Sequence, residues 1–437
     1  MPADRPRDAA EVAALVAAAA AEGTSFELVG GGSKRALGRP VRASRVLDLS
    51  GLAGITLYEP EELVLRAGCG TSRAAVEQTL AAHGQMLAFE PPDLGPLFGS
   101  APGADTIGGI IAANLSGPRR IKAGAARDHI LGVAAVNGLG ERFKSGGRVM
   151  KNVTGYDLSK LLTGSWGTLA AITELTLKVL PAPEIVTTLA LHGLSDAMAT
   201  AAMTAALGSS HEVSGAAHLP ARAATRAALG NAAATILRLE GFARSVAARA
   251  SALSDELAGF GAAARLEDGP SRLLWRQVRD VAPLLDPGPL PLPPPSRGGG
   301  FQNLSPPLAG GDGARSAPGE GLNPPNTGPL WRVSTAPTHG HKLVAALAPA
   351  EALYDWGGGL VWLALGEGEE DAGAARLRAA LAPLGGHATL IRAPAAVRAR
   401  VPVFEPQPPA LAALTRRVKA SFDPRNVLNP GRMVAET

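Results

Sequence analysis

The chain has a single cysteine, Cys69, among its 437 residues, so an internal disulfide framework is excluded. One thiolate cannot ligate a Cys₄ iron–sulfur cluster, and a cysteine-ligated cluster would therefore belong to a partner protein. Cys69 lies between a predicted strand and a predicted helix, and no charge pattern around it favours a low thiol pKa. We interpret it as a small buried packing residue rather than a nucleophile.

Aromatic residues make up only 4% of the sequence, and charged residues 18%. Lys and Arg total 42 against 38 Asp and Glu, but no basic run is interleaved with aromatic residues. This composition offers little for stacking on nucleic acid, whereas a slightly basic balance suits phosphate and small anionic substrates. No His, Asp and Glu spacing is typical of a metal site, so we predict none.

No apolar run approaches the roughly 20 residues that span a bilayer. The Ala-rich segment 9–21 follows Arg5 and Arg7, as in a signal sequence, but Glu11 interrupts it and no convincing A-x-A cleavage site precedes Gly23. Gly23 is instead well placed to end a helix. We therefore predict a folded N-terminal helix and a cytoplasmic protein.

The length allows two domains, and the pattern changes near residue 183. Residues 26–183 alternate between strands and helices, including strands at 63–67 and 172–180 and a helix at 71–82. Pro181 and Pro183 then mark a boundary. Beyond them, Ala-rich helices and short strands predict a helix-covered antiparallel sheet. The expected class is α+β, with domains at 1–183 and 184–404 and a C-terminal segment at 405–437.

A stretch crowded with Pro and Gly, residues 286–329, interrupts the second domain. Its composition predicts a flexible insert that contributes little to the core. A polyproline II motif that docks on a partner is the alternative.

Two glycine-rich segments carry the strongest chemical signal. The first follows a predicted strand and comprises Gly30, Gly31, Gly32, Ser33 and Lys34, and the second comprises Thr106, Ile107, Gly108 and Gly109. Bare backbone lets N–H groups approach a phosphate, with a hydroxyl and a Lys charge beside it. Neither segment is GxGxxG or GxxxxGK, so the pair predicts a diphosphate cradle that is neither Rossmann nor P-loop. We expect Gly31 and Gly108 to leave bare backbone beside the diphosphate.

The last segment, residues 418–433, reads as an amphipathic helix followed by two prolyl turns. The Asn429-Pro-Gly-Arg432 turn would hold Arg432 in a rigid loop. Such a loop is a way to place a positive charge beside an anionic ligand.

These segments resemble those of a known family. The two glycine segments follow the order found in FAD-binding domains of the PCMH (vanillyl-alcohol oxidase) type, and the closing Asp423 to Arg432 is similar to the signature of the D-lactate dehydrogenase and glycolate oxidase branch. Met-Lys-Asn-Val-Thr-Gly-Tyr-Asp-Leu at 150–158 resembles the FAD-binding subunits of bacterial glycolate oxidases most specifically. The resemblance implies a two-subdomain FAD-binding domain, a cap domain of helices and antiparallel sheet, and a C-terminal segment that returns to the flavin domain.

The resemblance also implies which residues hold FAD. The set comprises Gly30, Gly31, Gly32, Ser33, Lys34, Thr106, Ile107, Gly108, Gly109, Gly124, Ala125, Asp128, Ile172 and Thr173. Ala125 stands where the family often has Ser or Thr, so one phosphate contact is expected to be missing. Relatives with covalent flavin often carry His after the first glycines, whereas this chain has Ser33-Lys34, so FAD is expected to be non-covalent.

The function implied is that of an FAD-dependent oxidoreductase subunit that converts glycolate to glyoxylate and passes electrons on. A 2-hydroxy acid needs a cation for its carboxylate and a base for its hydroxyl. Lys151, Arg432 and His387 are the candidates, and the sequence does not assemble them into one site. Arg119, Arg120 and Arg127 could be solvated surface charges. Of the three, Arg127 is the best candidate for a structural role, paired with Asp128.

Three other functions stay open. The chain could be an electron-relay or assembly subunit without its own substrate site, a stand-alone FAD-linked D-2-hydroxy-acid dehydrogenase, or a scaffold with a degenerate flavin fold. The implied partners are a second flavoprotein subunit and an iron–sulfur subunit of a glycolate oxidase complex, which could hold the chain at the inner face of the membrane.

Overall fold

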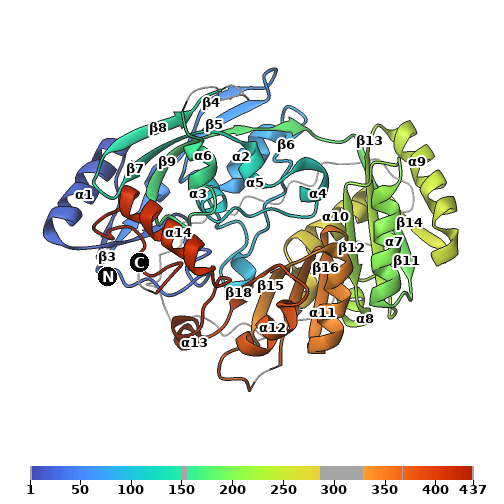
Figure 1. Ribbon diagram of the computed structural model, residues 1–437. Coiled ribbons are helices and arrows are strands. Elements are labelled where there is room, and N and C mark those ends of the chain that lie inside the picture. The colour runs from blue at the N-terminus through green and yellow to red at the C-terminus, as the bar shows by residue number, and fades with distance from the viewer. Residues whose placement is uncertain (1, 149–154, 286–327, 367, 436–437) are drawn as a thin grey trace.

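A computed structural model describes residues 2–148, 155–285, 328–366 and 368–435. Two bodies lie side by side in Figure 1: an N-terminal domain, and a cap domain built on a large sheet. The Pro/Gly-rich insert predicted at 286–329 lies almost entirely outside the described residues, as does Lys151.

The N-terminal domain has two subdomains. The first consists of the first helix and a three-stranded parallel sheet, with the elements β1 (Ala3–Asp4), α1 (Ala9–Glu22), β2 (Phe26–Val29) and β3 (Arg45–Asp48), followed by η1 (Leu49–Gly51). Asp8 caps α1 by accepting from the amides of Ala10 and Glu11, and Gly23 ends it with a φ of 69°. The Ala-rich segment that resembles a signal sequence is thus a folded helix here.

The second subdomain is a five-stranded antiparallel sheet in the order β4-β5-β9-β7-β8. Its strands are β4 (Ile55–Glu59), β5 (Val64–Gly68), β7 (Ile130–Asn137), β8 (Arg142–Gly146) and β9 (Ala170–Lys178), and β6 (Gln85–Met86) pairs with β10 (Leu180–Pro181). Its helices are α2 (Arg73–Ala81), η2 (Gly95–Phe98), α3 (Ile107–Ala112), α4 (Arg120–Ala123), α5 (Ala126–His129) and α6 (Leu158–Leu162).

The cap domain is an eight-stranded antiparallel sheet in the order β14-β11-β13-β12-β16-β17-β15-β18. The strands are β11 (Ile185–His192), β12 (Gly215–Leu219), β13 (Ala234–Gly241), β14 (Ala263–Leu266), β15 (Leu330–Ser334), β16 (Glu351–Asp355), β17 (Leu360–Ala364) and β18 (His387–Arg392). The helices are α7 (Asp196–Gly208), α8 (Ala221–Arg226), α9 (Ala243–Glu256), η3 (Ala258–Phe260), α10 (Asp268–Arg279), η4 (Ala282–Leu284), η5 (Pro337–His339), α11 (Gly340–Leu347), η6 (Trp356–Gly358), α12 (Ala374–Leu381) and α13 (Ala395–Arg400).

Strand β17 shows how this sheet separates two cores. Val361 and Leu363 face the core formed with α11 and α12. Leu360 and Trp362 face the opposite core, which includes Leu37, Leu94 and Leu97 of the N-terminal domain. Because successive side chains of a strand alternate between faces, one face of the sheet is covered by these helices and the other faces the N-terminal domain.

The C-terminal segment returns to the N-terminal domain through α14 (Pro409–Phe422), which crosses that domain in Figure 1. The amide of Phe26 donates to the carbonyl of Val427 at 2.7 Å, and the amide of Asn429 donates to the carbonyl of Phe26 at 2.9 Å. Residues 427–429 thus run beside β2, with Leu428 in a parallel bridge to Phe26. The predicted α+β class, with its C-terminal return, is confirmed.

A buried charge cluster joins the two domains. Arg119 and Glu90 of the N-terminal domain meet Arg238 and Glu240 on β13 of the cap domain. The distances are 2.7 Å from Arg119 Nε to Glu240 Oε1 and 2.9 Å from Arg238 Nη1 to Glu90 Oε1. Burial alone would raise the pKa of Glu240, but Arg238 and Arg119 lower it to about 2. The interpretation of Arg119 as a solvated charge is therefore wrong, because its side chain is only 9% exposed.

Removing one partner of this cluster should weaken the fold markedly. In Glu90→Gln, two buried guanidinium groups would share the single carboxylate of Glu240, and breaking a buried pair typically costs about 3–5 kcal/mol. We expect a loss of free energy of unfolding of that order, measured by urea denaturation.

The matched control is Lys122→Ala, which removes an exposed pair between the same two domains. Lys122 lies 3.1 Å from Glu212, and the side chains are 48% and 64% exposed. Such pairs contribute about 0–1 kcal/mol. Equal losses in the two variants would show that burial of the cluster does not matter.

Candidate functional site

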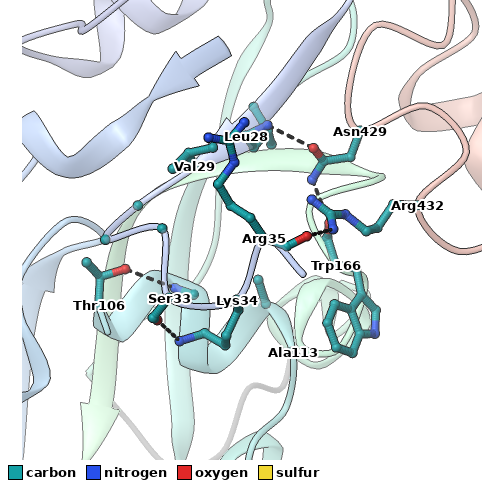
Figure 2. Close-up of a pocket in the computed structure, with 15 residues that line it drawn as sticks. Leu28, Val29, Ser33, Lys34, Arg35, Thr106, Ala113, Trp166, Asn429 and Arg432 are labelled. Atoms are coloured by element: carbon teal, nitrogen blue, oxygen red, sulfur yellow. Dashed lines mark hydrogen bonds between the residues drawn. The ribbon is translucent and has the colours of Figure 1, made fainter. Parts of the chain in front are cut away.

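A pocket opens between the end of β2 and the start of α3 (Figure 2). Its lining combines the first glycine segment, the second and the C-terminal turn: Leu28, Val29, Gly30, Gly31, Gly32, Ser33, Lys34, Arg35, Thr106, Gly109, Ala112, Ala113, Trp166, Asn429 and Arg432. An adjoining pocket shares several of these residues and adds Leu49, Cys69, Gly108, Gly167, Ala170 and Ile172. The two form one elongated cleft across the N-terminal domain.

The first glycine segment packs on the residues that lead into the second, and the second packs on the turn after β5. A Cβ atom on Gly31 would lie 1.6 Å from the carbonyl oxygen of Ala104, and one on Gly108 would lie 2.7 Å from that of Cys69. Both glycines are thus required for contact between protein segments. Both glycines also line the pockets, so their expected place beside a diphosphate stays a prediction. Gly32 differs from these two glycines, since its φ is +77° and no atom lies within 4 Å of its Cβ position, which leaves its backbone open.

Lys34 is a cation in this pocket without a carboxylate of its own. Its amine donates to Ser33 Oγ at 3.2 Å, and burial lowers its pKa. The nearby carboxylates of Asp105 and Asp93 bind Arg73, at 2.9 and 3.4 Å. Within the described residues Lys34 forms no ion pair, so an anion bound beside it would compensate its charge.

The N-terminus of α3 borders the same space. Thr106 caps this helix by accepting the Gly109 amide at 3.3 Å (Figure 2). A hydroxyl, a primary amine and the open backbone at Gly32 therefore converge on one pocket, and this donor set fits a diphosphate.

The C-terminal turn fixes the far wall of the pocket. Asn429 Oδ1 accepts the Leu28 amide at 2.8 Å, while its Nδ2 donates to the Trp166 carbonyl at 2.7 Å (Figure 2). The sequence indicated the turn at Asn429 only as a support for Arg432, and it did not single out Trp166, because a lone Trp does not indicate a ligand.

Arg432 holds the first loop in place. Its Nη1 donates to the carbonyls of Arg35 and Leu37 at 3.1 and 2.7 Å, and its Nη2 lies 3.2 Å from Glu27 Oε1. Burial lowers the pKa of Arg432 to about 10, with Glu27 opposing the shift. With these donors engaged, its geometry favours positioning of the loop over contact with a substrate.

Other predicted site residues lie away from the cleft. Ile107 is fully buried in the core, and Thr173 Oγ1 donates to the Ala134 carbonyl at 3.1 Å. Asp128 accepts the Ala125 amide at 2.8 Å at the start of α5. A Cβ on Gly124 would lie 3.0 Å from the same carboxylate, so these three residues form a closed turn.

The other charged candidates have different surroundings. Arg127 is exposed, and no ion pair with Asp128 is found within the described part of the chain. His387 begins β18 of the cap domain, outside the cleft. Cys69 is buried as predicted, and burial raises the pKa of its thiol to about 12.

Across the described ranges, no helix is long and apolar enough to cross a membrane. No group of three or more His, Cys, Asp or Glu side chains in those ranges could hold a metal ion.

Comparison with known proteins places this chain in a family. It is 32% identical over 415 residues to the glycolate oxidase subunit GlcE of Escherichia coli (strain K12), covering 94% of this chain and 93% of the relative. This chain belongs to the GlcE family. The FAD binding domain family matches residues 3–146, which include both glycine segments of the cleft. A D-lactate dehydrogenase of Anaerostipes hadrus is 36% identical over 157 residues, covering 36% of this chain and 31% of that relative.

Solved structures share the fold of this GlcE family member. p-Cresol methylhydroxylase with bound substrate superposes with a TM-score of 0.69 at 14% identity, over 99% of this chain and 88% of that one. An alkyldihydroxyacetonephosphate synthase gives 0.65 at 16% identity, over 98% and 75%. The predicted PCMH-type architecture is confirmed.

The two adjacent glycines of α3 should respond differently to a methyl group. In Gly108→Ala the Cβ would meet Cys69 backbone at 2.7 Å, and such overpacking typically costs about 1–3 kcal/mol. In Gly109→Ala the nearest atom is the flexible Lys34 side chain at 3.3 Å, and Ala favours a helix over Gly by up to about 1 kcal/mol. We expect only Gly108→Ala to lower the free energy of unfolding. Equal stabilities in thermal and urea unfolding would contradict the close packing described.

Proposed function

We propose that this chain is the FAD-binding subunit of a complex that oxidises glycolate or a similar small 2-hydroxy acid. The observation that carries the proposal is the near full-length similarity to a glycolate oxidase subunit, together with a cleft whose donors suit a diphosphate. The bound flavin would accept the electrons of the hydroxy acid.

The residues proposed to hold FAD come from both glycine segments. Lys34 supplies charge to the diphosphate, Ser33 and Thr106 supply hydroxyls, and Gly32 leaves backbone open beside them. Ile172 lines the adjoining pocket and would contact the less polar part of the dinucleotide. No histidine follows the first glycines, which supports a non-covalent cofactor.

The proposed partners are a second flavoprotein subunit and an iron–sulfur subunit. The subunit name of the Escherichia coli relative supports assembly with other chains. The single, buried Cys69 supports placing any cysteine-ligated cluster in a partner. The cytoplasmic location remains a prediction, as does attachment to the membrane through partners.

Removing the charge of Lys34 should weaken FAD binding without unfolding the chain. A hydrogen bond to a charged group contributes about 1.5–3 kcal/mol, so Lys34→Met should raise the Kd for FAD by about 10- to 150-fold. The measurement is titration of FAD into flavin-free protein. Acid precipitation of wild type should release all the flavin into the supernatant.

Lys144→Met is the control for this titration, because Lys144 is an exposed cation on β8. Its affinity for FAD should match that of wild type. Flavin retained in the acid-denatured pellet would refute non-covalent binding, and an unchanged Kd in Lys34→Met would place the diphosphate elsewhere.

The complex should need flavin in this chain for activity. When Lys34→Met is assembled with the partner subunits, we expect glycolate-dependent electron transfer to fall with the flavin content and to recover when FAD is added in excess. Lys144→Met should behave as wild type. Full activity of a complex whose copy of this chain lacks flavin would favour a purely assembling subunit.

A further inference from the structure

Two arginines at the interface between the cap sheet and the N-terminal domain lack carboxylate partners. Arg332 lies on β15 and Arg120 begins α4, and their guanidinium carbons lie 5.0 and 4.2 Å from the centroid of the Trp356 ring. In the described part of the chain neither guanidinium forms an ion pair or a side-chain hydrogen bond. By contrast, the neighbouring Arg119 and Arg279 are paired, with Glu240 and Asp280.

Their surroundings make this arrangement unusual. Burial lowers the pKa of Arg332 to about 10, and the positive charge of Arg120 acts in the same direction. A half-buried cation beside a like charge is unfavourable unless an anion approaches it. Stacking on an aromatic ring compensates only part of that cost, by about 0.5–2 kcal/mol.

The carboxyl group of Asp355, near Arg332, supplies only part of the missing charge. Asp355 and Arg332 both line a small cavity between the cap sheet and the N-terminal domain. The Oδ1 atom of Asp355 accepts the Trp356 amide at 2.7 Å. Burial raises the pKa of Asp355 to about 7, so a large share of this carboxyl is neutral at physiological pH. Arg238 and Arg332 lower that pKa and Glu90 raises it.

His387 lies on the same face of the sheet as Arg332. In the antiparallel pairing of β15 with β18, Arg332 is opposite Thr389 and Ser334 is opposite His387. Arg332 and His387 are therefore diagonal neighbours, within reach of long side chains. The side chain of His387 is exposed at the start of β18, yet partial desolvation lowers its pKa. Arg332 and Arg120 lower it further and Glu405 opposes them, so the ring is neutral at pH 7 and can accept a hydrogen bond.

We propose that Arg332 and Arg120 bind the carboxylate of a small 2-hydroxy acid and that His387 accepts a hydrogen bond from its hydroxyl. The choice of a 2-hydroxy acid rests on the proposed function, whereas the anion site rests on the arginines themselves. A guanidinium fork matches the planar geometry of a carboxylate. Leu94, Leu115 and Leu360 wall the adjoining cavity, which favours an acid of few carbon atoms.

The test is calorimetric titration of the flavin-loaded chain with glycolate and with acetate, which lacks the hydroxyl. Flavin absorbance is recorded throughout, so that turnover is not counted as binding. Wild type should bind glycolate more tightly than acetate. Arg332→Met and Arg120→Met should each weaken both acids by about tenfold or more. His387→Leu should weaken glycolate alone, and His387→Gln, which keeps an acceptor, should restore part of that affinity.

Arg127→Met is the matched control, since it removes an exposed arginine from the neighbouring α5 and should leave both affinities unchanged. Arg120 is also exposed, so its variant provides a test even if Arg332→Met does not fold. Unchanged affinities in Arg120→Met, equal weakening by Arg127→Met, or tighter binding of inorganic phosphate than of either acid would overturn the assignment. A chain that takes up no flavin but still binds glycolate in this pattern would refute the proposed function and leave the anion site standing.

Discussion

The close packing of two glycine-bearing segments against neighbouring backbone is the constraint on which the rest of the cleft depends. The backbone at Gly31 meets that at Ala104, and the backbone at Gly108 meets that at Cys69, with no space for a side chain. This contact brings Lys34 and Thr106 to one pocket from positions about seventy residues apart in the sequence. The small side chain of Cys69 belongs to the second of these contacts, which accounts for its burial.

Charge is distributed unevenly across the interface between the domains. In the buried cluster, two arginines and two glutamates neutralise one another and link the domains: Arg119, Arg238, Glu90 and Glu240. Arg120, the residue after Arg119, faces an aromatic ring and another cation instead. Adjacent arginines in one sequence thus have opposite roles, the first structural and the second available to an anion.

The sequence was informative where local chemistry decides the structure. Strand alternation, proline boundaries and glycine segments predicted the α+β class and the region of the cleft. It was less informative where partners come from distant segments. The residues around Arg119 do not indicate that it pairs with Glu240, and those around Arg432 do not indicate its pairing with Glu27. The sequence therefore could not distinguish a buried structural arginine from a solvated or ligand-binding one.

The glycines illustrate the same limit. A run of glycines indicates that there is no room for side chains at those positions. It does not indicate whether a ligand or another segment of the protein takes up that room. Only the structure separates Gly32, which faces open space, from Gly31, which faces a carbonyl.

The bond between Leu28 and Asn429 joins residues 401 positions apart, and it sets an order of events during synthesis. The chain leaves the ribosome from its N-terminus, so β2 and both glycine segments emerge long before the residues that complete their pocket wall. Until then the strand edge at Phe26 lacks its pairing with residues 427–429, and an unpaired edge is prone to association with other chains. Completion of the cleft therefore cannot precede the synthesis of residues 427–429, and this edge of β2 stays unpaired until then.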